Sequence, residues 1–81
     1  MRAPILLPDL QAGPATLSTW FAEVGEWVFE GDRLVEVLVG GATFDVPAPA
    51  TGRLVEKQAL NNDPLRPGQV LGAVEAEDPD A

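Results

Sequence analysis

An internal repeat is the feature of this 81-residue chain that most restricts its fold. Displacing the sequence by 37 positions superposes apolar, acidic and glycine positions of the two halves. The superposed pairs are Ala15 and Gly52, Leu17 and Leu54, Ala22 and Ala59, Glu26 and Asp63, Val28 and Leu65, Gly31 and Gly68, Leu34 and Leu71, and Val37 and Val74. Each copy is too small to bury its own apolar face, so the two copies are expected to close on each other.

Short apolar and β-branched runs, separated by eight prolines and eight glycines, predict many short strands joined by tight turns. No segment keeps a helical period. Residues 16–24 come nearest, but Thr16, Thr19 and Val24 favour a strand and Gly25 ends it. We predict an all-β fold, a flattened barrel or sandwich of two antiparallel sheets with a quasi-twofold repeat. The expected strands lie near residues 4–7, 15–24, 27–29, 33–39, 42–46, 52–59, 64–66 and 69–75.

Composition excludes several classes of protein. The chain has no cysteine and no histidine, which removes disulfides, thiolate chemistry and the commonest general base and metal ligand. A net charge of -8 disfavours binding to nucleic acid and to anionic membranes. The longest apolar runs are about six residues, too short to insert into a membrane, and no basic segment precedes an apolar stretch as in a secretory signal. We therefore expect a cytoplasmic protein.

The acidic residues give no sign of an active site or a metal site. Glu23, Glu26, Glu30, Asp32 and Glu36 are spread over turns and strand faces without an accompanying base or nucleophile, so a solvated surface explains them. The turn at residues 61–64 carries oxygen ligands, but it lacks the glycine and the distal glutamate of a calcium loop. We predict no catalytic residue and no bound metal, and hence no enzyme.

The pair Gly40-Gly41 stands between the apolar run 34–39 and a second strand-like run, 42–46. Two glycines between two such runs predict a β-hairpin with a two-residue turn. That turn would place Glu36 opposite Asp45, and because like charges directly opposed are destabilising, the register stays open.

Four segments together resemble the biotinyl/lipoyl domains, most closely the lipoyl domains of 2-oxo-acid dehydrogenase acyltransferase (E2) components. The segments are residues 4–8, 24–37, 36–52 and 67–71, and Trp20 lies where the family often has tryptophan. Glu36-Val37 and Ala42-Thr43 resemble the lipoyl branch more than the biotinyl one. The resemblance implies a barrel-sandwich hybrid, with a lipoyl-like domain over residues 1–76 and a flexible acidic tail over residues 77–81.

In that family the hairpin tip reads Asp-Lys-Ala and its lysine carries the prosthetic arm. The resemblance places Gly41 where this lysine stands, so the tip supplies no amine. Lys57 is the only lysine of the chain, and we expect it to be a solvated residue on a strand face, opposite Trp20 and away from the tip. Neither lipoate nor biotin is therefore expected as a cofactor.

Four apolar residues are candidates for contact with a partner protein. The resemblance to lipoyl domains implies that Val28 points inward, so the strand alternation turns Trp27 and Phe29 toward solvent, toward a partner or under a neighbouring loop. Leu38 and Val39 make the outer hairpin unusually apolar. Trp20 is expected to be half-buried.

These observations favour a non-catalytic, unmodified lipoyl-like domain that serves as a protein-binding or assembly module, whose partner the sequence does not identify and which could form oligomers. An alternative is the amino-terminal carrier domain of a dihydrolipoamide acyltransferase-type protein whose arm is borne elsewhere. A second alternative is the lipoyl-like hairpin of a transport or membrane-fusion assembly. It ranks last because such proteins usually carry a long helical insertion between the half-motifs.

Overall fold

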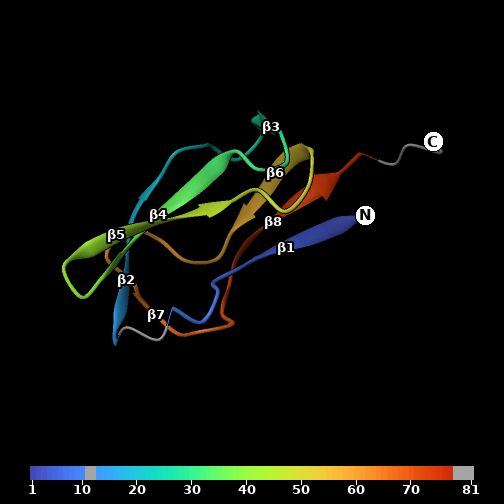
Figure 1. Ribbon diagram of the computed structural model, residues 1–81. Helices are drawn as coiled ribbons and strands as arrows, with labels where there is room; N and C mark the ends of the chain where they lie inside the picture. Colours follow the sequence, from blue (N-terminus) through green and yellow to red (C-terminus); the bar gives the residue numbers. More distant parts are fainter. Residues whose placement is uncertain (11–12, 78–81) are drawn as a thin grey trace.

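The computed structural model describes residues 1–10 and 13–77, which form eight β-strands (Figure 1). The strands are β1 (Arg2–Leu6), β2 (Ala15–Trp20), β3 (Trp27–Val28), β4 (Arg33–Val39), β5 (Ala42–Pro47), β6 (Gly52–Lys57), β7 (Pro64–Leu65) and β8 (Val70–Ala76). The predicted all-β fold is confirmed, and each expected strand is present.

Two four-stranded antiparallel sheets build the molecule, and both follow the same order. One sheet runs β1-β8-β6-β3 and the other runs β5-β4-β2-β7. The 37-residue repeat carries β2 onto β6, β3 onto β7 and β4 onto β8, and β1 and β5 hold equivalent edges. Each sheet thus contains strands of both copies, which confirms the predicted quasi-twofold closure.

The strand irregularities also repeat. The register of β2 against β4 shifts between Leu17 and Thr19, and the register of β6 against β8 shifts between Leu54 and Glu56, the positions 37 residues later. A β-bulge increases the local twist of a strand. Matching bulges in the two copies therefore give both sheets the curvature that lets them close.

Four turns share one design. Each has a backbone hydrogen bond from its fourth residue to its first, and a positive φ at the third, at Gly25 (99°), Gly31 (91°), Asn62 (73°) and Gly68 (79°). In each, a side-chain oxygen of the fourth residue accepts a hydrogen bond from the first backbone N–H. The four acceptors are Glu26 (3.3 Å), Asp32 (3.0 Å), Asp63 (2.8 Å) and Gln69 (2.9 Å).

The core lies between the two sheets and is built from repeat-related side chains. Leu17 and Leu54 are fully buried, as are Val37 and Val74. Within the described residues every buried side chain of the core is apolar. Burial of these alternating positions is the main stabilising term for so small a domain, which hides only about 60% of its unfolded surface.

Two predicted strands extend past the observed ones by more than one residue. β2 ends at Trp20 instead of residue 24, because the turn starting at Glu23 is closed by Glu26, and β6 correspondingly ends at Lys57. Of the predicted tail, Glu77 is described and donates its backbone N–H to the carbonyl of Thr51 at 3.0 Å. The remainder of that tail lies outside the described residues.

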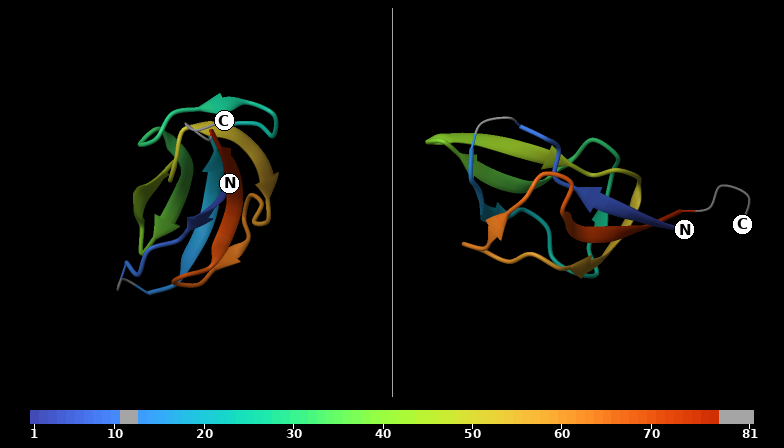
Figure 2. Two further views of the ribbon diagram at one scale, coloured as in Figure 1. Left: turned by 90° about the vertical axis from the view of Figure 1, so that its right-hand side faces the viewer. Right: turned by 90° about the horizontal axis from the view of Figure 1, so that it is seen from below.

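The molecule is elongated, with extents of 42 × 20 × 17 Å. The β4–β5 hairpin projects at one end, and the N-terminus lies at the other end together with the end of β8 (Figures 1 and 2). The turn at residues 40–41 therefore lies at the end of the molecule opposite the N-terminus.

Candidate functional site

The β4–β5 hairpin has the two-residue turn that its sequence predicts. Val39 pairs with Ala42, and both turn residues have positive φ, 55° at Gly40 and 85° at Gly41. Such φ values belong to the primed turns that match the twist of a hairpin, and glycine reaches them without steric cost. Gly41 is exposed, and a Cβ added there would have nothing within 4 Å. The tip is thus displayed to solvent, with room for a side chain.

The pairing places Glu36 directly opposite Asp45. Each carboxylate has a partner that offsets the repulsion between them. Ser18 donates its hydroxyl to Oε2 of Glu36 at 3.0 Å, and Nη1 of Arg33 lies 3.9 Å from Oδ2 of Asp45. Exposed pairs of this kind contribute less than about 1 kcal/mol, so the turn and the buried side chains of β4 decide the register.

Lys57 is not the solvated residue that the sequence predicts. Its side chain is only 16% exposed, and Nζ lies 3.5 Å from Oε2 of Glu23 and 5.2 Å from the centroid of the Trp20 ring. The quasi-twofold axis causes this, because repeat-equivalent positions 20 and 57 meet where the two copies face each other. Trp20 is half-buried as predicted, and its indole N–H donates to the carbonyl of Ala59 at 2.8 Å.

Of the four candidate contact residues, three are exposed and one is buried. Trp27, Phe29 and Leu38 are 42%, 60% and 45% exposed, and Val28 points inward at 3%. Val39 is only 7% exposed and belongs to the core, so its side chain is not available to a partner. Contact through the three exposed side chains remains a prediction.

The acidic residues of the turns have structural roles. Their carboxylates accept backbone hydrogen bonds inside the turns, and no group of three or more side chains in residues 1–10 and 13–77 could hold a metal ion.

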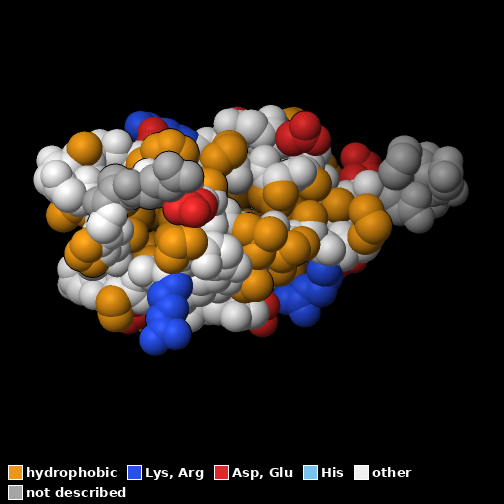
Figure 3. Space-filling view, turned by 60° about the horizontal axis from the view of Figure 1, so that its bottom comes forward, with side chains coloured by type: hydrophobic (Ala, Val, Ile, Leu, Met, Phe, Trp, Pro, Cys, Tyr) orange, Lys and Arg blue, Asp and Glu red, His pale blue; other side chains and the backbone are white. Residues whose placement is uncertain are grey.

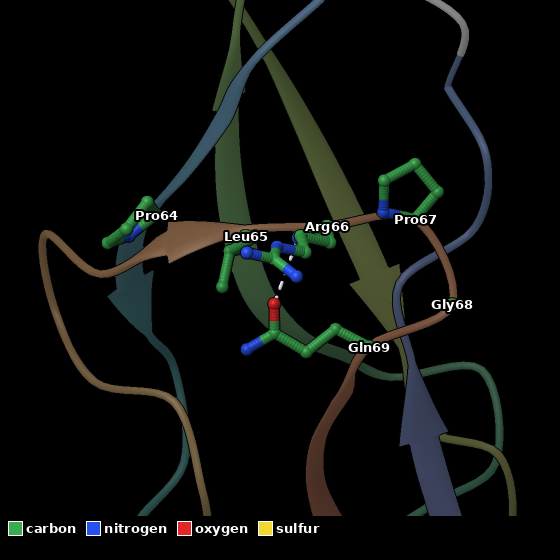
Figure 4. Close-up of a pocket in the computed structure, with 6 residues that line it drawn as sticks. All are labelled: Pro64, Leu65, Arg66, Pro67, Gly68 and Gln69. Carbon is green, nitrogen blue, oxygen red and sulfur yellow. Dashed lines mark hydrogen bonds between the residues drawn. The ribbon is translucent and has the colours of Figure 1, made fainter.

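A surface hollow over residues 64–69 lies at one of the four capped turns (Figure 4). Among its lining residues, the amide oxygen of Gln69 accepts the backbone N–H of Arg66. The hollow is the outside of a capped turn.

A second hollow, missed by the sequence reasoning, runs between the edge strands β1 and β5. We call it the seam groove, and its lining residues are all apolar: Pro4, Ile5, Leu6, Pro8, Phe44, Val46, Pro47, Ala48 and Pro49. Figure 3 shows hydrophobic side chains gathered along the middle of one face of the molecule. The sequence does show prolines near both edge strands. Its pattern does not show that these two strands lie side by side.

Two small antiparallel sheets, with the β4–β5 hairpin turn at the end of the molecule opposite the N-terminus, define a small flattened β-sandwich. Among the described residues, nothing forms a helix of the length and apolarity that a membrane crossing requires.

A model of the biotin/lipoyl family, described as "Biotin-requiring enzyme", matches residues 1–74. The chain belongs to this family.

Curated relatives are components of 2-oxo-acid dehydrogenase complexes. The chain is 40% identical over 78 residues to a dihydrolipoyllysine-residue succinyltransferase component of the 2-oxoglutarate dehydrogenase complex from Bartonella vinsonii subsp. berkhoffii, covering 94% of this chain and 19% of the relative. It is 38% identical over 69 residues to a lipoamide acyltransferase component of a branched-chain alpha-keto acid dehydrogenase complex from Pseudomonas aeruginosa, covering 83% of this chain and 15% of the relative. The chain therefore spans less than a fifth of each of these relatives.

Proposed function

We propose that this domain is a lipoyl-type domain that is not lipoylated, with Gly41 at the position of the acceptor lysine. It serves instead as a non-catalytic protein-binding or assembly module, within or beside a 2-oxo-acid dehydrogenase-type system. Its partner is a protein, and it takes neither lipoate nor biotin. The observation that carries this proposal is a displayed hairpin whose tip consists of Gly40 and Gly41.

An acyl arm needs a nucleophilic amine at an exposed place. Apart from the N-terminal amine, the chain offers one, Nζ of Lys57. That amine lies in β6, beside Glu23 and over the ring of Trp20, and its side chain is mostly buried. The N-terminal amine lies 2.9 Å from Oε1 of Glu75, on a strand that pairs far from the hairpin tip. Both positions argue against an arm attached elsewhere on this domain.

Intact-mass measurement after co-expression with a lipoate ligase and a biotin ligase tests the proposal. We expect the unaltered domain to keep the mass of its bare chain, because the hairpin tip presents no amine. A lipoyl or biotinyl mass on the unaltered chain would contradict the proposal.

The matched positive control is Gly40→Asp combined with Gly41→Lys, which restores an Asp-Lys-Ala tip ahead of Ala42. Val39 stays in place because its side chain is buried. There is room for the new lysine at position 41. If the folded double variant gains a lipoyl mass, the glycine at position 41 accounts for the absence of lipoylation in the unaltered chain. A folded variant that stays bare would show that other surface features also block the ligase, contrary to the role given to Gly41.

A second candidate function follows from the small part of each relative's length that this chain matches. The domain could be the amino-terminal carrier-type part of a dihydrolipoamide acyltransferase-type protein in which another copy bears the arm, since the chain matches less than a fifth of such proteins. The length of the natural gene product distinguishes the two. A long product with a further lysine-bearing lipoyl domain would favour the carrier protein.

A further inference from the structure

We propose that the outer edge of β5 binds an extended, basic segment of a partner protein, which adds as a strand beside β5 and places its apolar side chains in the seam groove. This inference deepens the proposed function by naming the surface and the chemistry of the partner, and it rests on that function only for the existence of a protein partner. Strand addition gives main-chain hydrogen bonds for affinity and alternating side-chain contacts for specificity.

β5 presents a free backbone edge. It is the terminal strand of its sheet, and in a two-residue hairpin the pair flanking the turn, Val39 and Ala42, is hydrogen-bonded. Hydrogen-bonded and non-hydrogen-bonded pairs alternate along antiparallel strands, so the backbone groups of Thr43 and Asp45 point away from β4. In the described part of the chain, neither makes a backbone hydrogen bond outside the strand ladders.

The other three edges are poor templates for a new strand. β3 and β7 have only two residues each, and β1 carries Pro4 in its middle, where no N–H is available. β5 has no proline from Ala42 to Val46, and Pro47 ends this open stretch. An unprotected edge of this length is a template on which another strand can pair.

The seam groove supplies the apolar side of the site. Phe44 pairs with buried Val37 and so faces the core side of the sheet, yet it is 41% exposed because β5 is an edge. Leu6, 49% exposed, lines the opposite wall with Pro4. Apolar side chains at alternate positions of an added strand would cover these residues.

Charge selects a basic partner. Asp45 and Glu36 stand side by side on the outer face of the hairpin, and the chain carries a net charge of -8. Asp45 is exposed and its one ion-pair contact, with Arg33, is long at 3.9 Å, so a lysine or arginine of an added strand could lie closer to this carboxylate; Glu36 is only partly exposed. A second copy of this acidic chain would add to the repulsion, so a basic segment is the occupant that the surface fits.

Titration of the isotope-labelled domain with a blocked peptide Val-Arg-Val-Arg-Val-Arg-Val tests the inference. Valines at alternate positions match the seam groove, and arginines between them match Asp45. We expect chemical-shift changes in β5 and β1 and slower amide exchange at Thr43 and Asp45. The same peptide with glutamate for arginine should not bind. A peptide N-methylated on the groups that face β5 should bind at least about tenfold more weakly, because it loses several hydrogen bonds.

Surface variants locate the site without disturbing the core. Phe44→Ala is expected to weaken binding about tenfold through lost apolar contact. Asp45→Asn is expected to weaken it about threefold to tenfold through a lost partly exposed ion pair. The matched controls are Phe29→Ala and Glu30→Gln, an exposed aromatic and an exposed acid near β3, and these should leave the affinity unchanged.

Equal binding of the glutamate peptide, shift changes centred on β3, or no binding at millimolar peptide would each overturn the inference. None of these results bears on lipoylation, which the mass measurement decides by itself. If the unaltered chain stays bare while the peptide fails, the proposed function stands and its partner uses another surface, such as Trp27 and Phe29.

Discussion

Glycines of this chain serve three different purposes, which the sequence does not distinguish. Gly41 reaches a positive φ in open space, whereas Gly52 allows a close backbone approach: a Cβ there would lie 2.0 Å from the carbonyl oxygen of Glu75. Gly72 makes room for both a carbonyl of Glu56 and the indole of Trp20. The repeat superposes Gly52 on Ala15, so nothing in the pattern marks position 52 as requiring glycine.

Gly52→Ala is therefore expected to lower the free energy of unfolding by about 2–3 kcal/mol, the cost of overpacking against backbone that cannot move aside. Gly41→Ala, in open space, should cost only about 1 kcal/mol for its left-handed backbone. Urea denaturation of both variants measures the difference. Equal losses would show that the strand pair opens freely around position 52.

At the scale of elements, the four capped turns set where the strands begin and end. The repeat superposes Gly31 on Gly68 and places residue 62 at the position equivalent to Gly25. The structure adds that Asn62 takes the left-handed conformation of Gly25, its repeat equivalent. Asparagine tolerates this conformation better than other residues with a Cβ.

Replacement of Asn62 by alanine is expected to reduce the free energy of unfolding by about 1 kcal/mol, because alanine pays the full steric cost of a positive φ. Asn62→Gly should stay within about 0.5 kcal/mol of the parent, since glycine reaches this φ freely. Thermal and urea unfolding check both values, with Asn61→Ala as the neighbouring exposed control. A loss at position 61 as large as at position 62 would argue against a backbone cause.

At the scale of the whole molecule, side chains of the two copies contact each other at the quasi-twofold axis. Trp20 of the first copy donates its indole N–H to Ala59 of the second, and Lys57 of the second copy covers its ring. The contact of Lys57 with Trp20 joins β6 and β2, which are strands of opposite sheets. These contacts also leave the side chain of the single lysine only 16% exposed.

Trp20→Phe is expected to lower the free energy of unfolding by about 1–2 kcal/mol, the sum of one lost hydrogen bond and a weakened cation–π contact. Trp27→Phe, at an exposed position, should change it by less than about 0.5 kcal/mol. Denaturant unfolding followed by circular dichroism measures both. A neutral Trp20 variant would show that the copies are held together by core packing alone.

Several site predictions depended on which face of a strand a residue occupies. The family resemblance correctly placed Val28 inside, and alternation from that position correctly placed Trp27 and Phe29 outside. The same rule separates Leu38 from Val39, and the sequence interpretation treated both as outer residues although only Leu38 is exposed. Lys57 was misjudged because its partners Glu23 and Trp20 come from the other copy.

The sequence by itself determined the repeat, the eight strands, the two-residue turn and the absence of an amine at its tip, because alternation and turn chemistry are local properties of the chain. Only the tertiary structure decided which residues lie next to each other: the half-buried Lys57 against Trp20, the close approach at Gly52 and the seam groove between β1 and β5. These depend on contacts between residues distant in sequence. Closure of two sheets creates such contacts, and no local pattern encodes them.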